Sequence, residues 1–139
     1  RPKTNILQHF GQAAIRLHSP RFQCALPYLE THSSLLYYMT TLGVSVHTVE
    51  EAVKAEQLGA TYLMASHVFP TACKPSDPPI GVDTVKAICK AVKIPVYALG
   101  GVTPKTISQL QDVPIKGVAL MSGLMTCPDV PGYLKELRA

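Results

Sequence analysis

Short apolar segments that alternate with helix-like segments constrain this chain more than any other feature. The apolar segments are too short for buried helices and are bounded by glycine, proline or polar residues. Their polarity does not alternate, which is typical of strands buried on both faces, so the sequence predicts a parallel sheet in an α/β fold. The predicted strands are Ala13–Leu17, Leu42–Val46, Tyr62–Ala65, Pro95–Leu99 and Gly117–Met121.

Helical signals fall between these strands. Thr48 and Glu51 have the spacing of a capping box, and Gly59 is suited to end the helix that they begin. Apolar residues at i, i+3, i+4 and i+7 predict an amphipathic helix over Val85–Val92. Thr103-Pro104 predicts another helix start. A last helix is expected around Tyr133, Leu134 and Leu137.

The N-terminal part of the chain gives weaker signals. Asn5–Phe10 is compatible with a short helix that ends at Gly11. Phe22–Tyr38 is weakly helical, but Pro27 makes one unbroken helix unfavourable because its ring removes a backbone donor.

Composition narrows the class of protein. The 139 residues are 47% hydrophobic, enough for one globular core, so residues 1–139 are predicted to form a single domain. There is no run of about 18 apolar residues, so no membrane partner is expected. Four cysteines without a CxxC pair indicate reduced thiols and a cytoplasmic protein. The net charge of +4 is spread along the chain, so no nucleic-acid partner is predicted.

Polar and glycine residues gather where the predicted strands end. His67 follows one strand, and the loop after it carries Thr71 and Lys74. Gly100-Gly101 and Ser122-Gly123 follow the next two strands, where backbone amides can approach an anion without a Cβ between them. Because parallel strands place their carboxyl ends at one edge, these residues predict a phosphate site. Tight turns that merely need glycine remain the alternative.

Several of these segments together resemble the thiamine phosphate synthase/TenI superfamily. The resemblance runs in the right order from about Gly43 to Gly123. It implies a (β/α)₈ TIM barrel, of which this chain holds strands four to eight, because a whole barrel takes about 200 residues or more. A partial barrel would leave two sheet edges uncovered. We therefore expect a missing N-terminal barrel half or a homo-oligomeric partner. The segments that carry the resemblance are Gly43–Thr48 with Glu50–Ala52 behind it, His67–Lys74, Ile94–Pro104 and Gly117–Gly123.

Two enzymatic branches of the superfamily differ in the loop that follows the predicted strand Tyr62–Ala65. Ser66-His67 stands where the synthase usually has Gly-Pro, and Cys73 stands where it has a second threonine. Residues 1–30 contain no aspartate, and Glu30 is their only glutamate, whereas the synthase needs carboxylates for magnesium. The resemblance therefore implies a thiazole tautomerase, an isomerase that needs no cofactor. The alternatives are thiamine phosphate synthase, a transferase that uses Mg²⁺, and a non-catalytic phosphate-binding module.

The resemblance also suggests roles for individual residues. His67 is the predicted catalytic base and acid, since an imidazole can serve as both near neutral pH. A structural histidine is the alternative. The partner is a small-molecule thiazole phosphate, held at Gly100, Gly101, Ser122 and Gly123 with help from Lys74 and Thr71. Ser45 occupies the position at which the synthase contacts its diphosphate, and no metal ligand is predicted for the tautomerase.

Overall fold

The computed structural model describes residues 13, 16–17, 20–34 and 38–139. Five parallel strands form one sheet in the order β1-β2-β3-β4-β5, so each strand pairs with its neighbour in the sequence. Their bounds are β1 Arg21–Ala25, β2 Thr41–Val46, β3 Tyr62–Ser66, β4 Val96–Leu99 and β5 Gly117–Ala119. Consecutive parallel pairing of this kind is the strand order of a β/α barrel, here without closure among the described residues.

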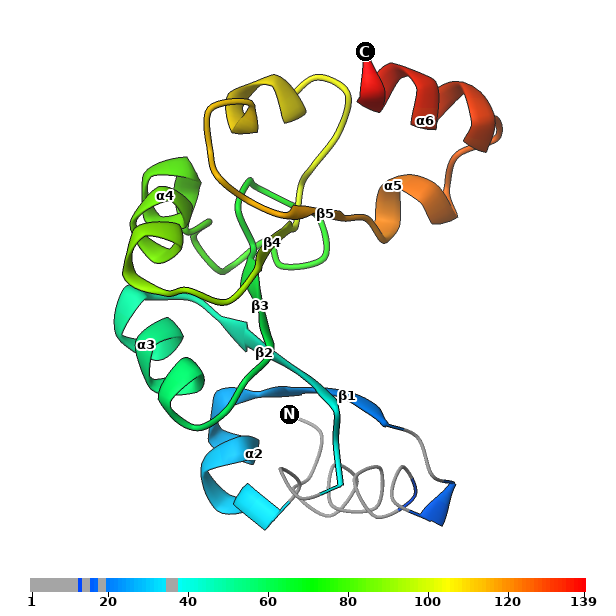
Figure 1. Cartoon of the computed structure of the whole chain (residues 1–139). Helices are drawn as coiled ribbons and strands as arrows, with labels where there is room; N and C mark the ends of the chain where they lie inside the picture. Colours follow the sequence, from blue (N-terminus) through cyan, green and yellow to red (C-terminus); the bar gives the residue numbers. More distant parts are fainter. Residues whose placement is uncertain (1–12, 14–15, 18–19, 35–37) are drawn as a thin grey trace.

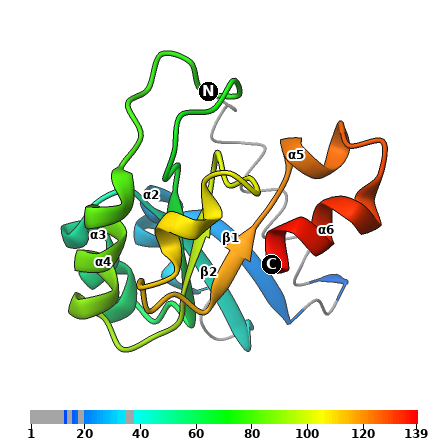
Figure 2. The same cartoon turned by 90° about the horizontal axis from the view of Figure 1, so that it is seen from above.

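Helices lie between the strands and cover one side of the sheet. Figures 1 and 2 show α2, α3 and α4 along the convex side of the curved sheet, while α5 and α6 lie at the β5 end. Helix α3 packs against both α2 and α4. The bounds are α2 Leu26–Thr31, α3 Val49–Gln57, α4 Gly81–Ala91, the 3₁₀ helix η2 Ile107–Leu110, α5 Ser122–Met125 and α6 Val130–Arg138.

The core lies between the sheet and these helices. Val44 and Leu63 are fully buried on the helix-facing side of β2 and β3, where they join Val85 and Ile88 of α4 in one apolar cluster. Tyr62 and Met64 alternate with Leu63 and are only half-buried, so the opposite, concave face of β3 is more open.

The capping box at the start of α3 is confirmed in part. The Thr48 hydroxyl accepts a hydrogen bond from the Glu51 amide at 3.2 Å, as expected. The Glu51 carboxylate reaches one residue further back than a capping box predicts, and it accepts the His47 amide at 2.7 Å.

The first strand was predicted in the wrong place. Ala13 and Arg16 are helical, and the Leu17 amide donates to the Ala13 carbonyl at 2.9 Å, whereas residues 14–15 lie outside the described part. The strand is Arg21–Ala25, in a segment predicted to be weakly helical. Pro27 lies in the first turn of α2, where its missing N–H costs nothing, so it marks a helix start and not a break.

Two further expectations concern helices. Thr103-Pro104 does not start an α-helix: the chain turns and forms only η2, while the Thr106 hydroxyl donates to the Gly101 carbonyl at 3.0 Å. Such side-chain bonds to the backbone compete with helix formation. The predicted helix at Asn5–Phe10 lies outside the described residues. No helix in the described part is long and apolar enough to cross a bilayer.

The two faces of β3 provide a stability test. Leu63→Ala removes a fully buried side chain, so we expect it to lower the free energy of unfolding by about 2–5 kcal/mol. Met64→Ala, on the neighbouring half-buried position, should cost clearly less. Urea denaturation of both variants measures the difference, and equal losses would contradict the assignment of the two faces.

Candidate phosphate-binding site

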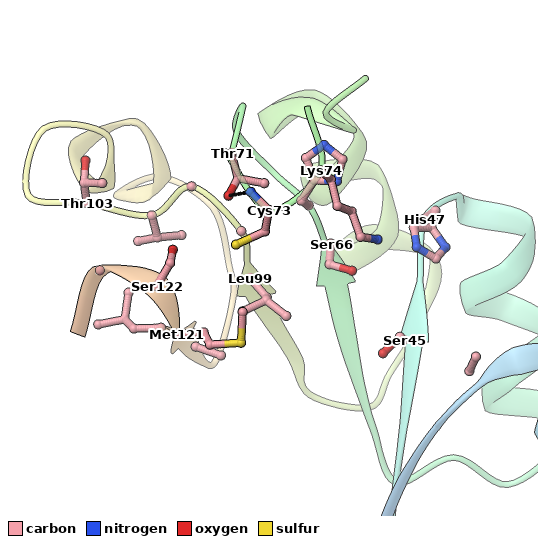
Figure 3. A pocket seen from close by; sticks show the side chains of 18 residues that line it. Ser45, His47, Ser66, Thr71, Cys73, Lys74, Leu99, Thr103, Met121 and Ser122 are labelled. Atoms are coloured by element: carbon pink, nitrogen blue, oxygen red, sulfur yellow. Dashed lines mark hydrogen bonds between the residues drawn. The ribbon is translucent and has the colours of Figure 1, made fainter. Parts of the chain in front are cut away.

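A cavity of about 440 Å³ opens at the carboxyl ends of the strands. This volume lies in the range of small-molecule sites. Figure 3 shows its labelled side chains, with Ser45 and His47 at one end and Ser122 and Thr103 at the other. All eight residues predicted from the sequence line it, namely Ser45, His67, Thr71, Lys74, Gly100, Gly101, Ser122 and Gly123. The structure thus brings them together, while their roles stay predictions.

The strands explain why these residues meet. Ser45 and His47 continue the alternation of β2 on the face opposite to buried Val44 and Val46, so both reach the cavity. Ser66 ends β3, and Leu99 ends β4 beside it in register. The turn after each strand then supplies the remaining wall.

The Gly100-Gly101 turn packs directly against the loop after β3. Both glycines have positive φ, 98° and 67°, which L-residues rarely adopt. A Cβ on Gly100 would collide with the Cβ of His67 and lie 2.8 Å from its Cα, and one on Gly101 would lie 2.7 Å from the Pro70 carbonyl oxygen. The close packing of the two loops therefore requires glycine at both positions, whether or not an anion binds there.

The second turn begins α5 at Ser122. This helix has four residues, so its macrodipole is short and the expected phosphate attraction cannot rest on it alone. The amides of a first helical turn have no partner within the helix, and Ser122 and Gly123 of this turn line the cavity. On the far side of this turn, the buried Tyr133 hydroxyl packs where a Gly123 Cβ would stand, 2.6 Å away, without a hydrogen-bond partner among the described residues.

Burial and hydrogen bonds fix the position of His67. Its side chain is almost buried, with 5% of the residue exposed, and its Nε2 lies 3.1 Å from the Asp77 carbonyl oxygen. Since a carbonyl only accepts, Nε2 carries the hydrogen and only Nδ1 is left to exchange a proton. The His67 carbonyl also accepts the Ile80 amide at 2.9 Å, so this residue anchors both ends of the loop.

The loop itself is folded by local hydrogen bonds. The Thr71 hydroxyl accepts from the Cys73 amide at 3.3 Å, and the Thr71 carbonyl accepts from the Lys74 amide at 3.2 Å. Thr71 therefore stabilises the turn of this loop. Lys74 is exposed, and its side chain extends into the cavity in Figure 3. No aspartate or glutamate is among the described residues that line the cavity, so nothing on its wall neutralises this lysine.

The comparisons with known proteins agree with this arrangement. The profile of the family described as thiamine monophosphate synthase (TMP-TENI) matches residues 29–124. This chain belongs to that family. The chain is 42% identical over 100 residues to thiamine-phosphate synthase 2 of Streptococcus pneumoniae, covering 69% of this chain and 48% of the relative. It is 39% identical over 97 residues to thiamine-phosphate synthase of Pyrococcus furiosus, covering 70% and 47%.

Solved structures extend the likeness across the fold. A thiamine phosphate pyrophosphorylase from Pyrococcus furiosus superposes with a TM-score of 0.76 at 31% identity, over 92% of this chain and 62% of that one. A structure titled native KDPGal gives a TM-score of 0.67 at 22% identity, which supports the fold alone. The chain spans about half the length of the curated relatives it matches. This fits the expectation of a partial barrel.

The names of the relatives bear on the choice between the two enzymatic branches. They are named as synthases and not as tautomerases, so membership of the TMP-TENI family is established and the isomerase branch is not. Sequence reasoning also set aside residues that this family member places in the cavity wall. The cavity is also lined by five residues for which the sequence analysis predicts no binding role, namely His47, Ser66, Cys73, Thr103 and Met121. The alternation of β2 through Ser45 would have indicated His47.

The glycine turn can be tested with a matched pair. Gly100→Ala introduces both a positive-φ alanine and a collision with His67, whereas Gly81→Ala has a φ of 81° but nothing within 4 Å of its new Cβ. We expect Gly81→Ala to cost about 1–2 kcal/mol from backbone strain alone and Gly100→Ala clearly more. Thermal or urea unfolding of both variants measures this, and equal costs would show that the collision is relieved.

Cysteine reactivity tests the wall of the cavity. Cys73 is exposed and lines it, whereas burial raises the pKa of the Cys24 thiol to about 11 from 9.0. At about pH 8, iodoacetamide should therefore label Cys73 first and Cys24 last, because the thiolate is the reacting form. Mass spectrometry of the labelled peptides, with a denatured sample as control, identifies the order. Rapid labelling of Cys24 in the folded chain would contradict the burial of its side chain in β1.

The raised pKa of the Cys24 thiol also determines how the stability of the folded chain changes with pH. The thiol is neutral in both states below about pH 9, and only the unfolded state ionises readily between 9 and 11. Stability is therefore retained at neutral pH and lost as the pH rises through this window.

Proposed function

We propose that this chain supplies the phosphate-binding part of a thiamine-phosphate synthase. The proposal rests on one observation above all: strand-end residues of a synthase-family fold converge on a cavity that contains a lysine and no described carboxylate. Such a wall favours an anion because the Lys74 ammonium is not neutralised by the protein. The substrate class is a phosphate ester of a small heterocycle, a thiazole phosphate.

Individual residues have separate tasks under this proposal. Lys74 contributes the full positive charge, while the amides at Gly100-Gly101 and Ser122-Gly123 approach the phosphate closely. The Ser122 hydroxyl donates a further hydrogen bond. Ser45, at the other end of the cavity, faces the diphosphate of the second substrate, whose pyrophosphate leaves as the two rings are joined.

Magnesium does not fit the described residues. Mg²⁺ prefers carboxylate and other oxygen ligands, but no aspartate or glutamate is among the described residues that line the cavity. No group of three or more His, Cys, Asp or Glu side chains in the described part is arranged to hold a metal. Under the proposal, its carboxylates belong to the part of the relatives that this chain does not span.

The tautomerase is a second candidate because His67 lies in the cavity wall. In that reaction an imidazole removes one proton from a carboxylated thiazole phosphate and returns one to another carbon. The bond from Nε2 to the Asp77 carbonyl leaves Nδ1 as the only ring atom for such a transfer. This restraint, together with the names of the relatives, makes the synthase the better-supported proposal.

A binding experiment on the full chain tests the phosphate site. We expect thiazole phosphate to bind, and Lys74→Met to weaken binding about 10- to 100-fold, because a charge-assisted contact contributes about 1.5–3 kcal/mol. Isothermal titration calorimetry measures both. Lys90→Met, on the exposed surface of α4, is the matched control and should bind like the unmodified chain. Equal effects of the two substitutions, or no binding at all, would refute the site.

A second assay separates the two reactions. The tautomerase needs one substrate and no metal, so isomerisation of carboxylated thiazole phosphate by this chain would favour it. In that case His67→Ala should lower turnover by about 10²–10⁴-fold. Under the synthase proposal no isomerisation occurs, and pyrophosphate is released only when both substrates and the remaining part of the barrel are present.

A further inference from the structure

His47 is a second imidazole in the cavity wall, and it is held differently from His67. It follows β2 directly, and its Nδ1 lies 3.1 Å from Oε2 of Glu51. The same carboxylate oxygen accepts the backbone amide of His47 at 2.7 Å. Because a carboxylate only accepts, Nδ1 carries a hydrogen and Nε2 is left as the atom that can contact a ligand.

The support behind this ring is built into the start of α3. Glu51 lies in the first turn, where the Thr48 hydroxyl holds its amide. One carboxylate therefore fixes both the backbone and the ring of His47, although 46% of the histidine side chain remains exposed. A restrained but accessible ring is pre-organised for binding, since little further side-chain freedom is lost on contact with a ligand.

The charges around His47 favour an anion at this end of the cavity. In Figure 3 the Lys74 side chain extends toward His47, with Ser45 and Ser66 nearby. Glu51 is engaged behind the ring, and Glu50 is exposed on the same helical turn. A protonated His47 and Lys74 would repel each other across the cavity, and an anion between them turns that repulsion into attraction.

We propose that His47, oriented by Glu51, is a second anion-contacting residue that donates its Nε2–H to a diphosphate at the Ser45 end of the cavity. This deepens the proposed function and rests on it, because it assigns the diphosphate to a place separate from the Ser122 end. Only the imidazolium form can donate from Nε2 while Nδ1–H is held by Glu51. Binding of the anion therefore favours the protonated form of His47.

The direction of the pH effect follows from this coupling. Only the imidazolium donates from Nε2 while Nδ1–H is held by Glu51, so diphosphate affinity should rise as the pH falls. Pyrophosphate takes up protons itself, so the informative quantity is the difference between the unmodified chain and a His47 variant.

Calorimetric titration of the full chain with pyrophosphate, without metal, measures this difference. At about pH 5.5 we expect His47→Gln to bind about tenfold more weakly than the unmodified chain, and at about pH 8 the two should converge. His32→Gln, whose ring stacks on Tyr28 at a centroid distance of 4.1 Å, is the control and should follow the unmodified chain. Equal affinities of His47→Gln and the unmodified chain at both pH values would overturn the proposal.

The histidine ring itself gives a second readout that a merely structural role would not move. Long-range ¹H–¹⁵N spectra should show His47 in the Nδ1–H tautomer when neutral, and pyrophosphate should shift its Nε2 resonance. Glu51→Ala should yield a mixture of tautomers while the Thr48 cap still holds the residue 51 amide. If pyrophosphate left the Nε2 resonance of His47 unshifted, contact between this ring and the anion would be excluded. This readout uses the unmodified chain, so it holds even if a variant folded poorly.

Thiazole phosphate distinguishes this inference from the proposed function. If thiazole phosphate binds through Lys74 but pyrophosphate affinity is independent of His47, only the His47 proposal fails. If pyrophosphate binding depends on His47 while thiazole phosphate does not bind, the synthase proposal fails and the anion site stands.

Discussion

Parallel pairing of consecutive strands is the constraint on which the rest of this structure depends. Because β1 to β5 run in one direction, every strand delivers its last residue to the same edge. Because they also pair in sequence order, right-handed crossovers place the connecting helices α2, α3 and α4 along one side. Alternate residues then separate by function. Val44 and Leu63 pack under the helices, whereas Ser45 and Ser66 face the cavity. The site is thus a consequence of strand direction and of a two-residue period, not of any single motif.

The same constraint explains what sequence could and could not predict. Leu42–Val46 and Tyr62–Ala65 were recognisable because each buries apolar side chains in a segment too short for a helix. The strand Arg21–Ala25 was missed because it lies at the sheet edge and exposes Arg21, Gln23 and Ala25, so it shows little apolar signal. Thr103-Pro104 resembles a helix start, so the sequence predicted a helix where the structure has only the short 3₁₀ helix η2. The Thr106 hydroxyl donates to the Gly101 carbonyl and holds the chain in a turn before η2.

The two cavity histidines show the same limit at the level of the site. Position at a strand end was enough to place His67 in the cavity wall, but its partner is a backbone carbonyl ten residues away, fixed only when the loop folds. No local pattern encodes that contact. For His47 the partner was visible at i+4, yet Glu51 was interpreted only as part of a helix cap. The Glu51 carboxylate contacts both the backbone amide and the ring of His47. Only the three-dimensional structure shows that one residue makes both contacts.

The distribution of charged residues sets what the described cavity wall can bind. The described cavity wall contains a lysine, two histidines, hydroxyl groups and glycine turns, all suited to anions, and no carboxylate. Metal-assisted diphosphate chemistry needs carboxylates close to the same anion. In a barrel, residues from distant strands meet at one edge, so cationic recognition can reside in one half and metal ligation in the other. Under the proposed function this chain can bind phosphate without a metal, because the attraction between Lys74 and an anion does not require one.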